Sequence, residues 1–317
     1  MSWELSGSTF RRFPQNPGGA LDAGTVVRQA LPMSVINDGV EAARWLPADT
    51  FKGQHAVVTG GGTGLGLEIS RGLAALGAEV TILSRDPDNH TDLTDEAKAK
   101  GWTVHGQALD VREAASVAAA AEAVLERSGK VDILVNNAAG NFVCPTERLS
   151  ANAWRAVLGI VLDGTFFCSR DFGRSMIKQG SGNILNIVAT YATTGMPGVA
   201  HSASAKAGVL TLTKTLAAEW ARYNIRVNAI APGPFESARA AGNLWPTKEV
   251  EDHVRNLIPQ KRFAPAHEVA AQCLWILCPA SAWMTGECVV HDGGISLPRT
   301  FWEPGQRVSR PKSEDTQ

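Results

Sequence analysis

The segment HSASAK, residues 201–206, carries the groups that first suggest chemistry. Lys206 follows Ser202 by four residues, so the two side chains would share one face of a helix. The positive charge of such a lysine favours the ionised form of a nearby phenol or enolate. The chain has only two tyrosines, Tyr191 and Tyr223.

A second group of residues is typical of phosphate binding. The stretch TGGGTGLG, residues 59–66, follows a short apolar run and precedes a helical pattern. Glycines in such a turn allow the backbone to approach a pyrophosphate, and the N–H groups of the next helix point at it. This context at the start of a βαβ unit predicts a dinucleotide site. To it we assign Thr59, Gly60, Thr63, Gly64, Leu65 and Gly66.

The end of the second predicted strand bears on the choice of cofactor. Ser84 and Arg85 follow it, and a small residue with an arginine accommodates the 2′-phosphate of NADP. Asp86 lies at about the distance of the carboxylate that binds the ribose of NAD. It comes after the arginine, in DPDN (86–89), which we expect to form a solvated turn. We therefore predict NADPH.

Strand and helix patterns alternate around these residues. Apolar runs predict strands, and helical spacing or composition predicts helices between them. This alternation predicts an α/β fold, a doubly wound parallel sheet (Rossmann fold) in a single domain with an N-terminal extension. The strands are expected at 55–60, 79–85, WTVHGQALDV, VDILVNNA, 182–191 and 225–233, and the helices at 67–77, 113–128 and 205–223.

The same reading divides the chain into segments. Residues 1–50 would be an extension that lies on the main domain, with one short helix at 35–46, or else a partly disordered tail. Residues 51–297 would be the catalytic domain. Within that domain, 234–262 would form a substrate lid, and 298–317 would be a tail.

Composition excludes several function classes. Among 317 residues the formal net charge is −1, which gives no reason to expect nucleic acid or an anionic membrane as a partner. No apolar run approaches the ~18 residues of a membrane span. Five scattered cysteines without metal-ligand spacing favour a reduced intracellular protein without a metal site. The N-terminus lacks the apolar core of a secretory signal, so we expect a cytoplasmic protein rather than one of the mitochondrial matrix.

Together the motifs resemble the short-chain dehydrogenase/reductase superfamily. The matches are TGGGTGLG (59–66), ALDV (108–111), NNAAG (136–140), Lys206, PGPFES (232–237) and TGECVVHDGG (285–294). The resemblance implies Asp110 beside the adenine, Asn137 near the cofactor ribose, Lys206 on the nicotinamide ribose, and the Pro232-Gly233 turn near the nicotinamide. It adds Val111, Ala138, Pro234 and Phe235 to the cofactor site. It also implies a homo-oligomer, with a tetramer favoured.

Three departures narrow the resemblance. The usual active-site tyrosine, serine and asparagine fall at Ser202, Ala189 and Val161. This pattern, with NNAAGNF (136–142), PTERLS (145–150) and SASAKAG (202–208), resembles the 2,4-dienoyl-CoA reductases. In that subfamily the acid tyrosine lies upstream, which here is Tyr191.

The resemblance implies the reduction of a conjugated thioester in fatty acid metabolism. Tyr191 would donate the proton, and Asn141 would join it on the thioester oxygen in the manner of an oxyanion hole. Ser202 would assist or only leave room for a flat acyl chain, or else simply begin a helix. Asn141 could instead cap loop backbone, and His201 has no nearby carboxylate to orient it for catalysis. On the lid, Lys248, Arg255, Lys261 and Arg262 could meet the phosphates of an acyl-CoA or be an ordinary charged helix face.

Other functions stay open at this point. A trans-2-enoyl-CoA reductase or a reductase of a specialised metabolite would use the same groups. A non-catalytic NADP(H)-binding subunit would bind cofactor without turnover. Ketone reduction is disfavoured, because the serine and tyrosine that protonate a carbonyl oxygen are absent from their usual places.

Overall fold

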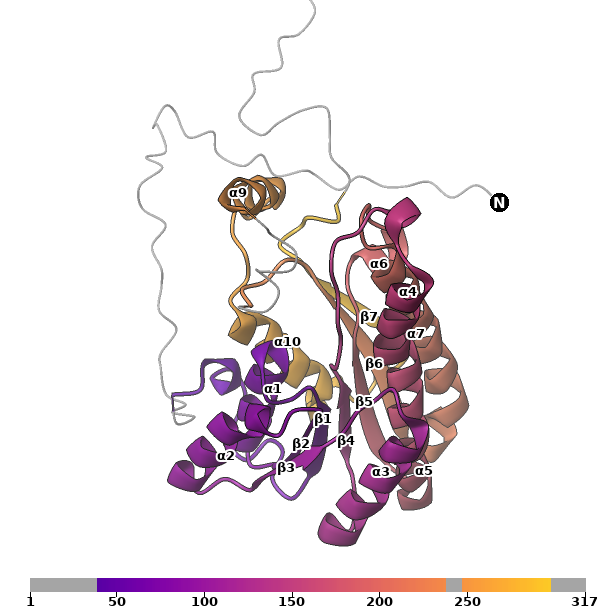
Figure 1. Cartoon of the computed structure of the whole chain (residues 1–317). Helices are drawn as coiled ribbons and strands as arrows, with labels where there is room; N and C mark the ends of the chain where they lie inside the picture. Colours follow the sequence, from indigo (N-terminus) through magenta and orange to yellow (C-terminus); the bar gives the residue numbers. More distant parts are fainter. Residues whose placement is uncertain (1–38, 238–246, 298–317) are drawn as a thin grey trace, which may run out of the picture. The chain divides into compact units, whose positions relative to one another are not determined.

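A seven-stranded parallel sheet organises the protein. The computed structural model describes residues 39–237 and 247–297, and the N-terminal part of the extension, part of the lid and the tail lie outside these ranges. The strand order is β3-β2-β1-β4-β5-β6-β7, which confirms the predicted doubly wound Rossmann architecture (Figure 1). The strands are β1 His55–Thr59, β2 Glu79–Ser84, β3 Val104–Ala108, β4 Ile133–Asn136, β5 Gly182–Ile187, β6 Ile225–Pro232 and β7 Cys288–His291.

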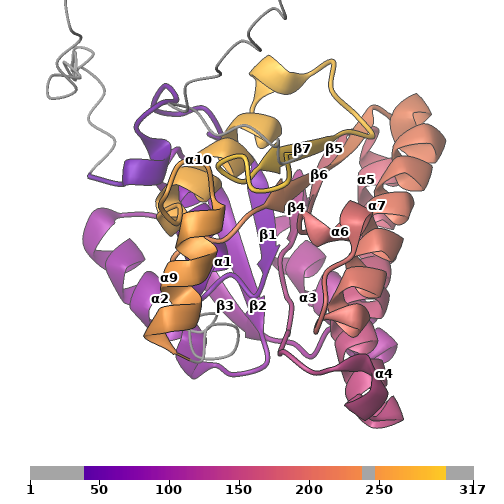
Figure 2. The ribbon, with the colours of Figure 1, turned by 90° about the horizontal axis from the view of Figure 1, so that it is seen from above.

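Helices cover both faces of the sheet. Helices α1, α2 and α10 lie on one face and α3, α5 and α7 on the other, as Figures 1 and 2 show. The helices are α1 Gly64–Ala75, α2 Asp88–Lys100, α3 Ala114–Ser128, α4 Ala151–Leu158, α5 Gly164–Gln179, α6 Tyr191–Thr194, α7 Ala200–Trp220, α9 Lys248–Leu257 and α10 Ala266–Leu277. Short 3-10 turns occur at Glu41–Ala43, Thr146–Arg148, Ala221–Tyr223 and Pro279–Ser281, and a π-helix spans Gly159–Asp163.

The sheet explains why the candidate residues gather. The central strands β1 and β4 are buried along their whole length, as expected for parallel strands covered on both faces. The strand order reverses between β1 and β4, and open α/β sheets bind ligands beyond the carboxyl ends of the strands at such a point. Thr59, Ser84, Asn136, Ile187 and Pro232 are the last residues of their strands, so the predicted site segments all begin at this edge.

Several element boundaries differ from those predicted. The strand expected at 182–191 ends at Ile187, and Tyr191 begins the single turn of α6. Helix α7 begins at Ala200 rather than at 205, so His201 and Ser202 belong to its first turn. The prediction of a solvated turn at 86–89 is wrong for Asp88 and Asn89, because these residues form the start of α2.

The segment before β1 packs on the domain core. Val40, Ala42, Ala43 and Phe51 are buried in a cluster with apolar residues of α1 and α10. The prediction of a helix at 35–46 is wrong for residues 39–46, where the structure has only the 3-10 turn Glu41–Ala43. Gly39 explains this in part, because its φ of +76° is not a right-handed helical value. Residues 35–38 lie outside the described ranges.

We expect deletion of residues 1–45 to destabilise the protein more than deletion of residues 1–38. The longer deletion also removes the buried side chains of Val40, Ala42 and Ala43, whose burial is worth roughly 3 kcal/mol. Denaturant unfolding of both truncated proteins measures the difference. Equal unfolding free energies would show that these side chains add nothing to the core.

Candidate functional site

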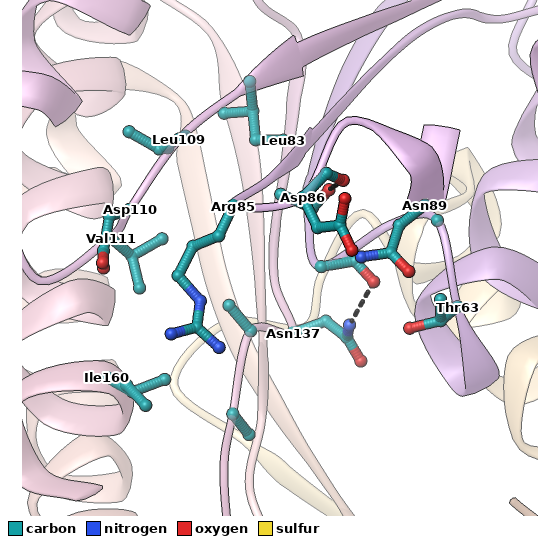
Figure 3. Close-up of a pocket in the computed structure, with 15 residues that line it drawn as sticks. Thr63, Leu83, Arg85, Asp86, Asn89, Leu109, Asp110, Val111, Asn137 and Ile160 are labelled. Atoms are coloured by element: carbon teal, nitrogen blue, oxygen red, sulfur yellow. Dashed lines mark hydrogen bonds between the residues drawn. The ribbon is translucent and has the colours of Figure 1, made fainter. Parts of the chain in front are cut away.

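A cavity of about 420 Å³ lies at the carboxyl ends of β1 to β4. Figure 3 shows Arg85 extending into the space between Ile160 and Asn137, with Asp110 and Val111 on one side. Eight of the seventeen predicted cofactor residues line this cavity: Gly60, Thr63, Ser84, Arg85, Asp110, Val111, Asn137 and Ala138. The other nine lie outside its lining. The further lining residues are Gly62, Leu83, Asp86, Asn89, Leu109, Ala139 and Ile160.

The glycine-rich turn has the shape that a phosphate group requires. Gly60 and Gly64 have φ values of +63° and +54°, which residues other than glycine rarely adopt. A Cβ on Gly66 would lie 2.2 Å from the carbonyl oxygen of Gly60, so only glycine fits there. Leu65 is buried in the first turn of α1, which starts at Gly64 and directs its free N–H groups toward the turn. This turn therefore fits the pyrophosphate of a dinucleotide.

Thr59 and Asn137 hold the turn against the end of β4. The Thr59 hydroxyl accepts hydrogen bonds from the backbone N–H groups of Asn137 and Ala138, both at 3.0 Å. The Asn137 amide donates to the carbonyl oxygens of Thr59 and Gly60 at 3.1 and 3.2 Å. Asn137 lines the cavity as expected, but its amide hydrogens are directed at the protein backbone.

Arg85 is the cation that the cavity offers to a phosphate. It is exposed and lines the cavity, and it makes no ion pair with any residue in the described ranges. The neighbouring Ser84 hydroxyl donates to the Asp86 carbonyl oxygen at 2.9 Å and lies 2.7 Å from Nε2 of His90. Asp86 also lines the cavity, while its carboxylate accepts from the backbone N–H of Asp88.

The Pro232-Gly233 turn expected near the nicotinamide lies at the end of β6, and the predicted cofactor residues Pro234 and Phe235 follow it. The backbone N–H of Gly233 donates to the His291 carbonyl oxygen at 3.0 Å, and a Cβ on Gly233 would lie 2.7 Å from Cα of Asp292. Phe235 forms a bridge with Ala264. Pro232 ends the strand, and Pro234 lines a separate cavity of about 320 Å³.

The structure brings Tyr191, Asn141 and Ser202 together. The Tyr191 hydroxyl lies 3.1 Å from the Ser202 hydroxyl and accepts a hydrogen bond from the Asn141 amide at 3.3 Å. Burial raises the pKa of Tyr191, and the bonds with Ser202 and Asn141 oppose that rise. The phenol is therefore protonated at neutral pH and can serve as an acid.

Lys206 lies one turn beyond Ser202 on α7. Its ammonium group donates to the carbonyl oxygen of Ile187, the last residue of β5, at 2.5 Å. Burial lowers the pKa of Lys206 to about 8. This lysine is thus a buried cation that loses its proton more readily than a surface lysine.

The structure supports no catalytic reading of His201. Its ring is fully buried and lies 4.3 Å from the ring of Phe142, and burial lowers its pKa. Neither ring nitrogen has a hydrogen-bond partner among the residues that the structure describes. Such buried unpartnered polar atoms are rare and cost stability.

We expect His201→Phe to raise the free energy of unfolding by about 1–3 kcal/mol, because it removes unpartnered polar atoms and keeps the ring contact. His55→Phe is the matched control. His55 is also buried, but its nitrogens bond Lys130 and Thr81, so this change should destabilise the protein. Urea unfolding of both variants is the measurement. Destabilisation by His201→Phe would contradict the expectation.

The cations of the predicted lid already have partners. Lys248 pairs with Asp252 at 2.8 Å, and Arg262 pairs with Glu268 at 2.8 Å. Arg255 pairs with Glu251, and Lys261 donates to a backbone carbonyl oxygen at 2.7 Å. For Lys248 and Arg255 on α9, these contacts fit an ordinary charged helix face better than a cluster poised for CoA phosphates, and Lys261 and Arg262 lie beyond the end of that helix.

Sequence reasoning missed some residues around the cavity. Two of them line the cavity: Ile160 belongs to the π-helix, and Asn89 lies in the first turn of α2. A third, His90, contacts the cavity residue Ser84 through its Nε2. Their places depend on how the helices pack. Sequence reasoning also missed Arg112, which bonds the Asp110 carboxylate. The two residues are only two positions apart, so their spacing could have indicated the pair.

Comparisons with known proteins identify the family of the chain. A family model described as enoyl-(acyl carrier protein) reductase matches residues 60–296. A Bacillus subtilis protein named as a probable 2,4-dienoyl-CoA reductase producing (2E)-enoyl-CoA is 42% identical over 244 residues, which cover 75% of this chain and 94% of the relative.

Solved structures have the same fold. A short-chain dehydrogenase from Bacillus anthracis has a TM-score of 0.70 at 40% identity and covers 80% of this chain and 100% of its own. A gluconate 5-dehydrogenase from Burkholderia cenocepacia, in complex with NADP and tartrate, has a TM-score of 0.74 at 33% identity and covers 78% of this chain and 98% of its own. The chain therefore belongs to the short-chain dehydrogenase/reductase superfamily and is an oxidoreductase.

Proposed function

We propose that the protein is an NADPH-dependent reductase of 2,4-dienoyl-CoA or a related enoyl thioester. The observation that carries the proposal is the cluster of Tyr191, Asn141 and Ser202, with Lys206 one turn away. It offers a protonated phenol and an amide donor at a site where the usual serine and tyrosine are replaced by Ala189 and Ser202. The name of the Bacillus subtilis relative supports the same substrate class.

The proposed roles use the contacts of Tyr191 and the buried charge of Lys206. NADPH, when bound, supplies the hydride. Tyr191 and Asn141 donate hydrogen bonds to the thioester oxygen, where negative charge develops as a conjugated thioester is reduced. Tyr191 then protonates carbon, directly or through water, and Ser202 holds the phenol in place. Lys206 binds the nicotinamide ribose, and its charge favours the phenolate left after proton transfer.

A substrate panel tests the proposal. NADPH oxidation is measured with 2,4-dienoyl-CoA, trans-2-enoyl-CoA and ketones, together with NADPH binding. Turnover of the dienoyl thioester supports the proposal. Turnover restricted to ketones overturns it, and binding without any turnover identifies a non-catalytic NADP(H)-binding subunit.

We expect Arg85→Ala to raise the Michaelis constant for NADPH about ten- to a hundredfold and to change that for NADH little. A charge-assisted contact with the 2′-phosphate is worth about 1.5–3 kcal/mol. Lys98→Ala removes a surface cation from neighbouring α2 and serves as the control. Equal effects of Arg85→Ala on both cofactors would remove the basis for NADPH.

A homotetramer is part of the same proposal. Strand β7 is an edge of the sheet. Near it in sequence, Trp283 is fully exposed, and Val290 and Leu297 are more than half exposed. Large exposed apolar side chains are typical of interaction surfaces. Sedimentation equilibrium measures the state, and a monomer would contradict the tetramer.

A further inference from the structure

The Asp110 carboxylate is held by Arg112 at the wall of the cofactor cavity. Nε of Arg112 lies 2.9 and 3.0 Å from the two carboxylate oxygens, and Nη2 lies 2.5 Å from Oδ2. The backbone N–H of Arg112 donates to Oδ1 at 3.0 Å. A planar guanidinium in this geometry fixes the plane of the carboxylate as well as its charge.

The π-helix Gly159–Asp163 and the first residue of α5 pack against the turn that holds Asp110 and Arg112. A Cβ on Gly164 would lie 2.7 Å from Cγ2 of Val111, and one on Gly159 would lie 3.7 Å from Cγ of Arg112. Gly164, the first residue of α5, therefore allows the end of the π-helix to lie close against Val111, and Gly159 lies within ordinary van der Waals distance of Arg112. Ile160 from this π-helix lines the cavity that Asp110 also lines.

The contacts with Arg112 limit how many further hydrogen bonds the Asp110 carboxylate can accept. A carboxylate has about four acceptor positions. Oδ1 accepts from the backbone N–H and Nε of Arg112, and Oδ2 accepts from Nη2 and shares Nε. Arg112 thus brings three hydrogens to the carboxylate, with that of Nε shared by both oxygens, which leaves about one of the four acceptor positions open. Because Asp110 lines the cavity beside Val111 and Ile160, that position is available to the edge of a flat base.

We propose that Arg112 is a positioning residue that orients Asp110 to accept a hydrogen bond from an exocyclic amine, and so selects adenine over a 6-oxo base in the cofactor. This inference rests on the proposed NADPH site. A 6-oxo base presents an acceptor to the carboxylate instead of a donor, which leaves both groups unpaired. Sites built to bond a donor reject ligands that lack it.

The charge of Asp110 fits this role. The hydrogen bond from Arg112 lowers the pKa of Asp110, and Arg85 contributes to the same direction. The carboxyl group therefore stays ionised at neutral pH and cannot turn into a donor for a 6-oxo base. Without Arg112 the carboxylate would be free to rotate away or to bind water.

Equilibrium binding tests the proposal without turnover. Dissociation constants for NADPH and for its hypoxanthine analogue, reduced nicotinamide hypoxanthine dinucleotide phosphate, are measured by calorimetry. We expect wild type to bind the analogue about 10- to 100-fold more weakly, the cost of an unpaired charged group. In Arg112→Ala the ratio of the two constants should fall below about threefold.

Two further variants make the result specific. Arg112→Lys keeps the charge but not the paired N–H groups, so selectivity should stay low, and full selectivity in this variant would overturn the orienting role. Arg174→Ala is the control, because it removes one of two arginines from Asp171 outside the cavity and should leave the ratio unchanged. Melting temperatures confirm that the variants fold.

The possible failures are distinguishable. Equal binding of both cofactors by wild type, or full selectivity in Arg112→Ala, would overturn the inference alone. Absence of NADPH binding by wild type would overturn the proposed cofactor with it.

Discussion

Tyr191→Phe is expected to lower kcat for a conjugated thioester by about 10²–10⁴-fold, the usual cost of losing a positioned acid. The change removes one hydroxyl and little volume, so the fold and NADPH binding should survive. The hydroxyl that is lost is the one that Asn141 and Ser202 bond, and its raised pKa keeps it protonated. Steady-state turnover of dienoyl-CoA, with NADPH affinity measured alongside, checks this result.

Ser202→Ala is the matched variant for that experiment. It removes the other hydroxyl of the 3.1 Å pair, and in the proposed mechanism it costs much less, because the serine only holds the phenol. Adding Ser202→Tyr to Tyr191→Phe should not restore full activity, since a phenol at 202 lies where a ketone oxygen would need it. A fully active Tyr191→Phe beside an inactive Ser202→Ala would place Ser202 at the chemical centre instead.

Local patterns predicted the fold because their causes are local. Apolar runs marked the strands, and the spacing of Gly60, Gly64 and Gly66 marked the first turn, where two positive φ values and a 2.2 Å approach require glycine. Boundaries were less predictable. NIVATY continues an apolar strand pattern, yet the strand ends at Ile187 and Tyr191 starts a helical turn.

The candidate site was predictable only in part. Asn141 and Tyr191 are 50 residues apart, so no spacing rule pairs them, and only the family resemblance placed both in one site. The lid cations show the opposite case. They form a basic cluster in sequence, but Arg255 and Lys248 are paired with carboxylates three or four residues away on α9.

Lys206→Met is expected to lower kcat/KM by about 10²–10³-fold, the typical cost of losing one aimed donor at a developing charge. The variant loses the buried ammonium group and its bond to Ile187. Lys214→Met is the control, because Lys214 is an exposed lysine two turns further along the same helix. Turnover and cofactor affinity of both variants are compared, and comparable losses would point to a general effect of charge removal.

The pH dependence of Lys206 supplies an independent measurement. Its pKa of about 8 lies below the ordinary lysine value of about 10.4, so the unfolded chain binds more protons between these pH values. The penalty for burying the charged lysine is full below pH 8 and disappears toward pH 10.4. The unfolding free energy of wild type should therefore rise relative to Lys206→Met across this window, while activity that depends on the charge falls. A constant difference between the two proteins from pH 7 to about 10.4 would show that Lys206 titrates like a surface lysine and that burial does not set its charge.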